Sequence, residues 1–186
     1  TFAIILGIPA ILIMMQPDFG SLFVLTLAAG GIYFVSGANP KHFFGGLGVA
    51  ALIATIAILT NPYIHKRFAV FMDPNLDPLG AGFQVKQALI AIGSGGFWGR
   101  GFQNSIQKFD YLPEVQSDTI FAAISEEMGF LRILMLIGAY LYIAHRGLFI
   151  AKNAPDNFTQ ILATGLTLWI VGQAFINIAV NLSLFP

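Results

Sequence analysis

The carboxylates that could do chemistry gather near the start of one long apolar stretch. Asp118 stands at its entrance, Glu114 lies four residues earlier, and Glu126 and Glu127 follow about two helical turns deeper. An aspartate at this place can be a simple helix N-cap, a common use of the residue. A carboxylate inside an apolar helix is rarely tolerated without a function, so the group is also a candidate for general acid–base chemistry.

Helical geometry separates the two deeper carboxylates. At about 100° per residue, Glu126 is rotated by roughly 80° from Asp118, whereas Glu127 is rotated by roughly 180°. We therefore expect Glu126 to face the same cavity as Asp118. Glu127 is expected to pair elsewhere, with Arg132 or with a neighbouring helix, and Arg132 is interpreted as a structural ion-pair partner.

The charged residues concentrate around these carboxylates, with 12 of the chain's 18 between residues 61 and 127. Three basic side chains in this region, Arg67, Lys86 and Arg100, are candidates to stabilise negative charge on a leaving group. Because long loops in compact proteins are usually functional, the segment 61–118 is the candidate site region.

Two stretches of this segment have recognisable local patterns. Residues 83–92 place apolar side chains at helical spacing around Gln84 and Lys86, which predicts a helix lying in a membrane interface. The glycine-rich stretch 93–101 follows, and two interpretations stay open. It is either a flexible turn that re-enters the membrane or a backbone cradle for a phosphate, to which Arg100 would add charge.

The composition indicates the surroundings in which these groups work. Hydrophobic residues make up 56% of the 186, and charged residues only 10%, with a formal net charge of zero, whereas an ordinary soluble domain has about 25% charged residues. This excludes a disordered chain, nucleic-acid binding through bulk charge, and almost any soluble enzyme. The chain has no cysteine, so thiolate metal sites and cysteine nucleophiles are also excluded.

The apolar stretches predict an all-α, polytopic membrane helix bundle. They are continuous rather than alternating, which excludes a membrane β-barrel. The basic residues Lys41, Arg146 and Lys152 fall on one side of the alternating spans, so that side is predicted to be cytoplasmic and the large loop extracytoplasmic. Asp18, in a tight turn, is interpreted mainly as a helix cap. The predicted spans are 1–15, 20–38, 43–60, 119–144 and 160–180, with the large loop at 61–118 and a connecting loop at 145–158.

A set of short motifs in fixed order resembles the SEDS family, the FtsW, RodA and SpoVE proteins of cell-wall synthesis. The resemblance covers essentially the whole chain, and its loop motifs look more like FtsW than RodA. The motifs are Gln16-Pro-Asp-Phe-Gly, Arg67-x-x-x-Phe-x-Asp-Pro, Gly82-Phe-Gln, Ala91-Ile-Gly-Ser-Gly-Gly, Tyr111-Leu-Pro-Glu-x-x-x-Asp-x-Ile-Phe, Glu126-Glu-x-Gly and Gln173-Ala-x-x-Asn.

The resemblance implies a fold, an activity and a location. It implies a ten-span helical protein of the bacterial cytoplasmic (inner) membrane, of which this single membrane domain, 1–186, would be roughly the second half. It implies a peptidoglycan glycosyltransferase that polymerises lipid II at the outer face of the membrane in cell division. It also implies Asp118 as the catalytic residue and a class B penicillin-binding protein, a transpeptidase, as partner.

The reaction expected from this resemblance assigns roles to the candidate residues. Asp118 would act as the base, with Glu114, Glu126 and Gln84 as supporting or substrate-binding residues. Arg67, Lys86, Arg100 or a divalent cation, Mg²⁺ or Mn²⁺, would stabilise the pyrophosphate leaving group, although no residue pattern specifies metal ligands. Two other functions stay open at this stage: a lipid II flippase, and a non-enzymatic scaffold that recruits a cell-wall transpeptidase.

Overall fold

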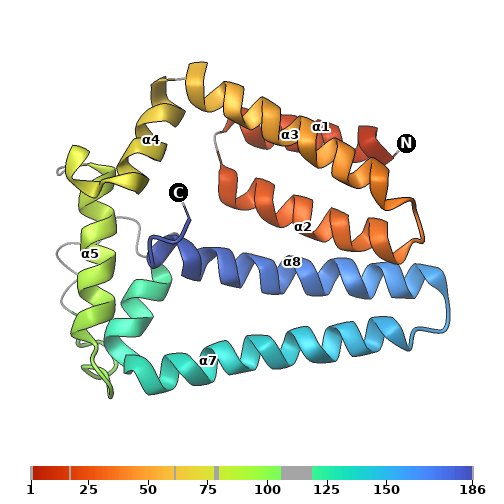
Figure 1. The fold of residues 1–186 in the computed structure, drawn as a ribbon. Helices are drawn as coiled ribbons and strands as arrows, with labels where there is room; N and C mark the ends of the chain where they lie inside the picture. Colours follow the sequence, from red (N-terminus) through yellow and green to blue (C-terminus); the bar gives the residue numbers. More distant parts are fainter. Residues whose placement is uncertain (1, 17, 61, 78–79, 106–118, 186) are drawn as a thin grey trace. The chain divides into compact units, whose positions relative to one another are not determined.

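The computed structural model describes residues 2–16, 18–60, 62–77, 80–105 and 119–185. All the regular elements in these ranges are helical. Figure 1 shows them in chain order. They are α1 (Phe2–Met15), α2 (Phe19–Val35), α3 (Pro40–Thr60), α4 (Pro62–Met72), the 3₁₀ helix η1 (Pro74–Leu76), α5 (Ala81–Ser94), α7 (Ile120–Lys152) and α8 (Asn157–Asn181).

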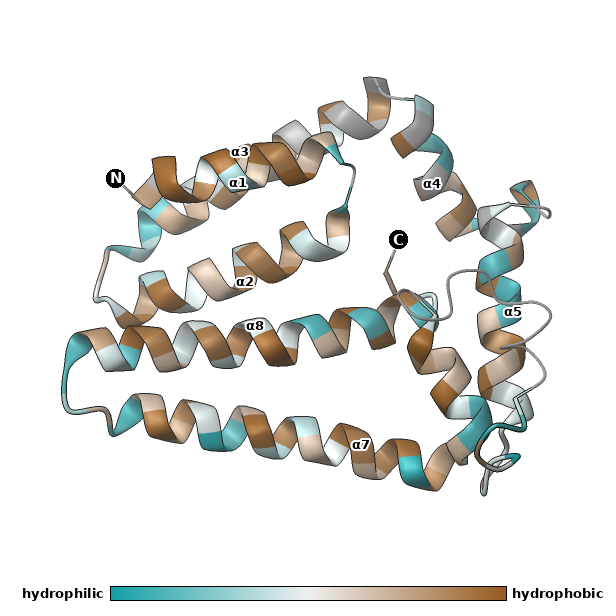
Figure 2. Ribbon diagram, turned by 180° about the vertical axis from the view of Figure 1, so that it is seen from behind, coloured by the Kyte–Doolittle hydropathy of each residue, from teal (hydrophilic) through white to brown (hydrophobic). Residues whose placement is uncertain are grey.

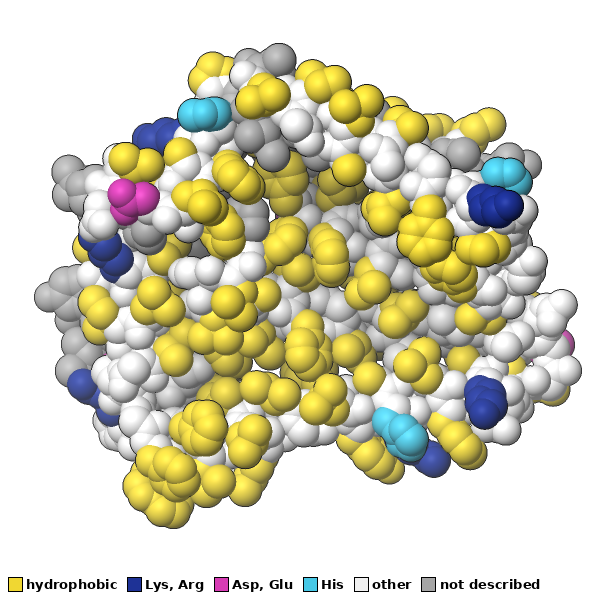
Figure 3. All heavy atoms as spheres, in the orientation of Figure 1, with side chains coloured by type: hydrophobic (Ala, Val, Ile, Leu, Met, Phe, Trp, Pro, Cys, Tyr) yellow, Lys and Arg dark blue, Asp and Glu magenta, His cyan; other side chains and the backbone are white. Residues whose placement is uncertain are grey.

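Two of these helices, α7 and α8, are long and apolar enough to cross a membrane. Their most apolar windows are only 6% and 17% buried, so they are not the enclosed core helices of a soluble protein. Figure 2 shows hydrophobic residues along α1, α2, α7 and α8, and Figure 3 shows how many such side chains are exposed on one face. An apolar outer surface of this kind is stable in lipid, where it meets hydrocarbon chains.

The contacts divide the chain into two compact units. The first is built from α1, α2, α3 and the adjoining parts of α7 and α8. It comprises Thr1–Asn61 and Tyr140–Ala174. Small residues let its helices approach closely: a Cβ added at Gly30 would lie 2.7 Å from the Phe43 ring of α3, and one at Gly172 would lie 3.2 Å from Leu27 of α2. This is the packing expected where no hydrophobic effect drives helix association in lipid.

The turn before α2 is capped as the sequence predicts. The Ser21 backbone amide donates to the Asp18 carboxylate at 3.0 Å, satisfying one of the amides left open at a helix start. The interpretation of Asp18 as a cap is therefore confirmed.

The second unit comprises Pro62–Ala139 and Phe175–Pro186, and within it α5 packs on the start of α7. Their contact is a small-residue core of Ala88, Ala91, Ala122 and Ala123, with Ile92 beside it. The alanines bring the two helix backbones close together. The end of α8 joins this contact, because the Ala122 backbone amide donates to the Asn181 side chain at 3.3 Å.

Two features differ from the predicted elements. The region predicted as one large loop contains α4, η1 and α5, and its charged residues Lys66, Arg67 and Lys86 lie on α4 and α5. The predicted connecting loop, 145–158, is mostly helix, since α7 continues to Lys152. His145 and Arg146 do not end it, because Leu148 to Ile150 continue the apolar pattern and the Arg146 guanidinium lies 5.6 Å from the Phe149 ring centroid.

Candidate functional site

A break in α7 organises the candidate site. Gly129 has φ 74° and ψ 175°, so the helix stops after Met128 and restarts at Phe130. This conformation is accessible essentially only to glycine, because a Cβ would collide with the backbone. The break leaves the last carbonyls of the first segment and the first amides of the second without partners within the helix.

The glycine-rich loop after α5 supplies those partners. Two of its amides donate to carbonyls before the break, and two of its carbonyls accept from amides after it. In apolar surroundings an unpaired backbone group costs several kcal/mol, so this reciprocal pairing makes the break possible. The four bonds are Arg100 N to Glu126 O (3.0 Å), Gly101 N to Glu127 O (3.1 Å), Phe130 N to Gly96 O (2.9 Å) and Leu131 N to Phe97 O (3.3 Å).

Glycines allow the loop to approach α7 this closely. A Cβ at Gly95 would overlap the Ser125 carbonyl oxygen and lie 3.0 Å from the Glu126 Cα. The amides of Gly99, Arg100 and Gly101 all donate to protein carbonyls. These three amides therefore have no free hydrogen to offer an anion, and the phosphate-cradle interpretation does not hold for them.

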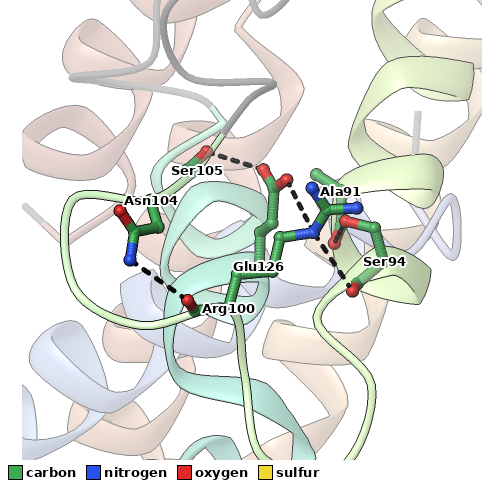
Figure 4. Close-up of polar contacts among 6 residues, drawn as sticks. All are labelled: Ala91, Ser94, Arg100, Asn104, Ser105 and Glu126. Atoms are coloured by element: carbon green, nitrogen blue, oxygen red, sulfur yellow. Dashed lines mark hydrogen bonds and ion pairs between the residues drawn. The ribbon is translucent and has the colours of Figure 1, made fainter.

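The Glu126 side chain lies in the centre of this junction. It is only 1% exposed, yet two side chains of the loop contact its carboxylate. The Ser105 hydroxyl donates to Oε2 at 2.6 Å, and Arg100 Nε forms an ion pair with Oε1 at 3.6 Å. Figure 4 shows the two partners approaching the two carboxylate oxygens. We call Arg100, Ser105 and Glu126 the carboxylate cluster.

Further polar contacts hold the partners of Glu126 in place. Arg100 Nε also lies 3.5 Å from the Ser94 carbonyl, and the Asn104 side chain donates to the Arg100 carbonyl at 3.3 Å (Figure 4).

On the other side of the break, Arg132 Nη1 donates to the Trp98 carbonyl at 3.2 Å. The guanidinium of Arg132 therefore fixes the loop backbone.

The predicted site residues divide into three groups. Arg100 and Glu126 are brought together. Lys86 and Gln84 lie on α5, where Lys86 Nζ donates to the Asn75 side chain of η1 at 2.8 Å. Arg67 lies on α4, and its side chain is outside the described residues, as are Glu114 and Asp118.

Sequence reasoning missed Ser105. A single serine at the end of a glycine-rich loop carries no local signal, because its acceptor is 21 positions away in the chain. The only indication was indirect: a carboxylate within an apolar helix needs hydrogen-bond donors, and the nearby loop is where polar residues concentrate. Within the described residues, no three Asp, Glu or His side chains form a group able to hold a metal ion.

These features define a class of protein. The chain is an all-α membrane helix bundle in which a broken spanning helix and a glycine-rich loop enclose an ion-paired carboxylate. The chain belongs to the FtsW/RodA/SpoVE family of cell cycle proteins, whose family model matches residues 1–186.

Relatives in several bacteria are similar in sequence to this chain. A protein of Idiomarina loihiensis named "Probable peptidoglycan glycosyltransferase FtsW" is 40% identical over 185 residues, covering 98% of this chain and 45% of the relative. Proteins of the same name from Marinobacter nauticus and Legionella pneumophila are 40% and 37% identical over 185 residues each, covering 98% of this chain and 46% and 47% of the relatives. The chain thus spans about half the length of these relatives.

A solved structure has the same fold. It comes from work on the structural coordination of polymerization and crosslinking by a peptidoglycan synthase complex. The match has a TM-score of 0.71 at 23% identity and covers 100% of this chain and 52% of the other. The predicted all-helical membrane fold and the family resemblance are confirmed.

Proposed function

We propose that this chain is the part of a peptidoglycan glycosyltransferase that carries its catalytic carboxylate. The whole protein would polymerise lipid II into glycan strands at the outer face of the cytoplasmic membrane, in cell division. Family membership and the names of the relatives support the activity. The observation that carries the proposal is the carboxylate cluster, whose buried Glu126 lies eight residues after Asp118 and three residues before the helix break. A membrane protein retains such a group where it handles polar or charged reactants.

The proposed reaction transfers a glycan between lipid carriers. A sugar hydroxyl attacks the anomeric carbon of a lipid-linked glycan, a new glycosidic C–O bond forms, and the C–O bond to the lipid pyrophosphate breaks. The hydroxyl proton passes to the Asp118 carboxylate, and the electron pair leaves with the pyrophosphate. Asp118 is therefore assigned as the general base, with Glu114 and Gln84 as supporting residues.

The leaving group requires positive charge. Arg67, Lys86 and Arg100 are the proposed sources, and Mg²⁺ or Mn²⁺ would supply the same stabilisation when bound to carboxylates and the pyrophosphate. The described residues contain no ready three-ligand group, so no step of the mechanism is routed through a cation. Arg100 is 39% exposed at its side chain while it pairs with Glu126, which leaves part of its guanidinium open to an anion.

Glu126 is proposed as a positioning residue rather than a catalytic one. Its carboxylate binds Ser105, the last described residue before the segment 106–118, and it belongs to the helix that follows that segment. Both ends of the segment that carries Asp118 are therefore attached to the first part of α7. We propose that holding Ser105 against α7 in this way helps to keep the catalytic carboxylate in a reactive geometry.

The partner and membrane side follow from the same proposal. Lipid II polymers are substrates for crosslinking, and the structural neighbour comes from a complex that coordinates both steps. We therefore propose a class B penicillin-binding protein as partner and an extracytoplasmic position for the region 61–118.

The decisive experiment is polymerisation of purified lipid II by the full-length protein in detergent. Wild-type protein should give a ladder of glycan products, and Asp118→Asn should give none while unfolding like wild type. Asp156→Asn, the same change at a helix cap remote in sequence, is the matched control and should retain the ladder. In detergent there is no second compartment, so a flippase or a scaffold would produce no glycan even as wild type. A ladder from Asp118→Asn would refute the assigned base.

Glu126→Gln separates positioning from catalysis. It keeps the volume and the acceptor for Ser105 but removes the charge that pairs with Arg100. We expect kcat to fall while the KM for lipid II changes little, with the pH dependence of kcat retained because the assigned base, Asp118, is unchanged. Loss of the pH dependence would instead make Glu126 the base.

A further inference from the structure

Four aromatic side chains project from the junction of the glycine-rich loop with α7. They are Phe97, Trp98 and Phe102 of the loop and Phe130 of α7, and we call them the aromatic corner. All four are exposed, Trp98 by 69% and Phe102 by 76%. The Phe97 ring contacts its neighbours, with centroid distances of 5.2 Å to Trp98 and 6.1 Å to Phe130. Figure 3 shows hydrophobic side chains gathered at the lower left, where this loop meets α7.

The backbone holds these rings outward. The loop is attached to α7 by the four hydrogen bonds across the break, and the Trp98 carbonyl accepts a further bond from Arg132. Phe97 contributes its own carbonyl to that pairing. A loop fixed in this way cannot turn its rings inward without breaking bonds, so the exposed patch is a property of the fold and indicates a binding surface.

The surface continues along an exposed apolar face of α7. Phe130, Leu134 and Gly138 are four residues apart and lie along one helical face, and Leu134 and Met135 are exposed. Since α7 is long and apolar enough to span a membrane and little of its apolar window is buried, this face is available to lipid. The aromatic corner extends the same face at the point where the helix breaks.

The residue types of the aromatic corner indicate its depth in the membrane. Tryptophan is enriched at membrane–water interfaces, where an amphipathic ring lies at headgroup level. Arg100 and Arg132 are both exposed, although each also contacts the protein, Arg100 through Glu126 and Arg132 through the Trp98 carbonyl. At a membrane interface the exposed part of such a guanidinium can also contact lipid phosphates.

We propose that the aromatic corner inserts into the interfacial layer of the bilayer, with Trp98 at headgroup level, and anchors the glycine-rich loop at a fixed depth. The partner of this surface is the lipid bilayer itself. Because Arg100 and Ser105 of the anchored loop hold Glu126, the bilayer surface would also set the depth of the carboxylate cluster. The proposal does not depend on the glycosyltransferase activity.

Tryptophan fluorescence of the full-length protein in vesicles tests the anchor. The protein is reconstituted in phosphatidylcholine with bromine either near the headgroup end or near the methyl end of the acyl chains. The difference between wild type and Trp98→Phe isolates the signal of Trp98. We expect quenching by the headgroup-end bromines to be about two-fold greater than by the methyl-end bromines. The matched control is Trp169→Phe, which isolates a tryptophan at the centre of α8 and should show the opposite order.

Each alternative partner of the aromatic corner gives a different quenching result. If the remaining half of the protein or a partner's helix covers the corner, the Trp98 signal will be quenched neither by brominated lipid nor by aqueous iodide. If the loop faces water, iodide alone will quench it. Either outcome overturns the proposal, as does stronger quenching by the methyl-end bromines. A second reporter, Phe102→Trp in the Trp98→Phe background, should reproduce the shallow quenching, and its failure to do so would limit insertion to one ring and refute the anchor.

Discussion

Replacing Gly129 by alanine should destabilise the protein strongly, although the change adds a single methyl group. Gly129 lies at the break of α7, with φ 74° and ψ 175°. The added Cβ would overlap the Gly99 amide nitrogen and lie 2.6 Å from the Trp98 carbonyl carbon. Both obstacles are backbone atoms, so no side-chain rotation can relieve the contact.

The expected cost has two parts. Holding a non-glycine residue in this conformation costs about 1–3 kcal/mol. Moving the loop away from the new methyl group sacrifices hydrogen bonds across the break, and the loss of two of the four costs about 1–3 kcal/mol at about 0.5–1.5 kcal/mol each. The free energy of unfolding should therefore fall by about 2–6 kcal/mol.

The assay is reversible unfolding of the full-length protein in mixed micelles with increasing SDS, followed by circular dichroism. The control is Gly138→Ala, nine residues later in the same helix, where a Cβ meets nothing within 4 Å. Gly138→Ala should be neutral or more stable by about 0.5–1 kcal/mol, because alanine loses less backbone entropy in a helix. If Gly129→Ala were as stable as Gly138→Ala, the break and its backbone pairing would not exist as described.

Three further variants test other contacts. Ser105→Ala should lower the free energy of unfolding by about 1.5–3 kcal/mol, because the buried Glu126 carboxylate loses a hydrogen bond. Ser105→Thr, which keeps the hydroxyl, should lower it by less than half as much in the same micelle assay. Equal losses in the two variants would contradict a role for the hydroxyl. The hydrogen bond from the Thr159 amide, and secondly the one from its hydroxyl, hold the pKa of Asp156 below the ordinary 3.8. The stabilisation of the start of α8 by this carboxylate is therefore complete above pH 3.8 and is lost as the pH falls through the lower pKa of the folded state. Asp156→Ala should therefore reduce hydrogen-exchange protection of Thr159 at neutral pH but not in acid, and a pH-independent difference would count against the carboxylate. Gly147→Ala should cost about 1–3 kcal/mol by overpacking against the Thr167 side chain, and stability equal to wild type would show that α7 and α8 pack otherwise.

Continuous apolar stretches located most helices because the surroundings of these helices are uniformly apolar. α1, α2, α3 and α8 coincide closely with the predicted apolar stretches, since a helix in hydrocarbon must satisfy its backbone internally and needs apolar side chains along its length. The helical pattern of residues 83–92 likewise lies within α5. The end of α7 was misplaced because basic residues were taken as a stop, whereas such side chains extend from helix ends toward polar surroundings.

The candidate site was only partly visible in the sequence. Glu126 and Arg100 were identified as charged groups near the apolar stretch, but their pairing and the contribution of Ser105 depend on contacts between positions 21 or more residues apart. The glycines of the loop suggested a cradle, yet the amides of Gly99, Arg100 and Gly101 donate to protein carbonyls, and the last two of these carbonyls belong to the broken helix. A glycine-rich stretch indicates that backbone amides are accessible as hydrogen-bond donors, but it does not indicate which acceptors they bind.

The sequence by itself determined the class of this protein. Scarce charge and long apolar stretches require a helical membrane bundle, and the ordered motifs identify the family. Only the tertiary structure decided that α7 breaks at Gly129, that the loop after α5 repairs the break, and that Glu126 lies between the two. The physical reason is that the unpaired amides and carbonyls at the break, and the buried carboxylate, find partners in whichever segment packs against them. Which segment packs there depends on the whole fold and not on the local sequence.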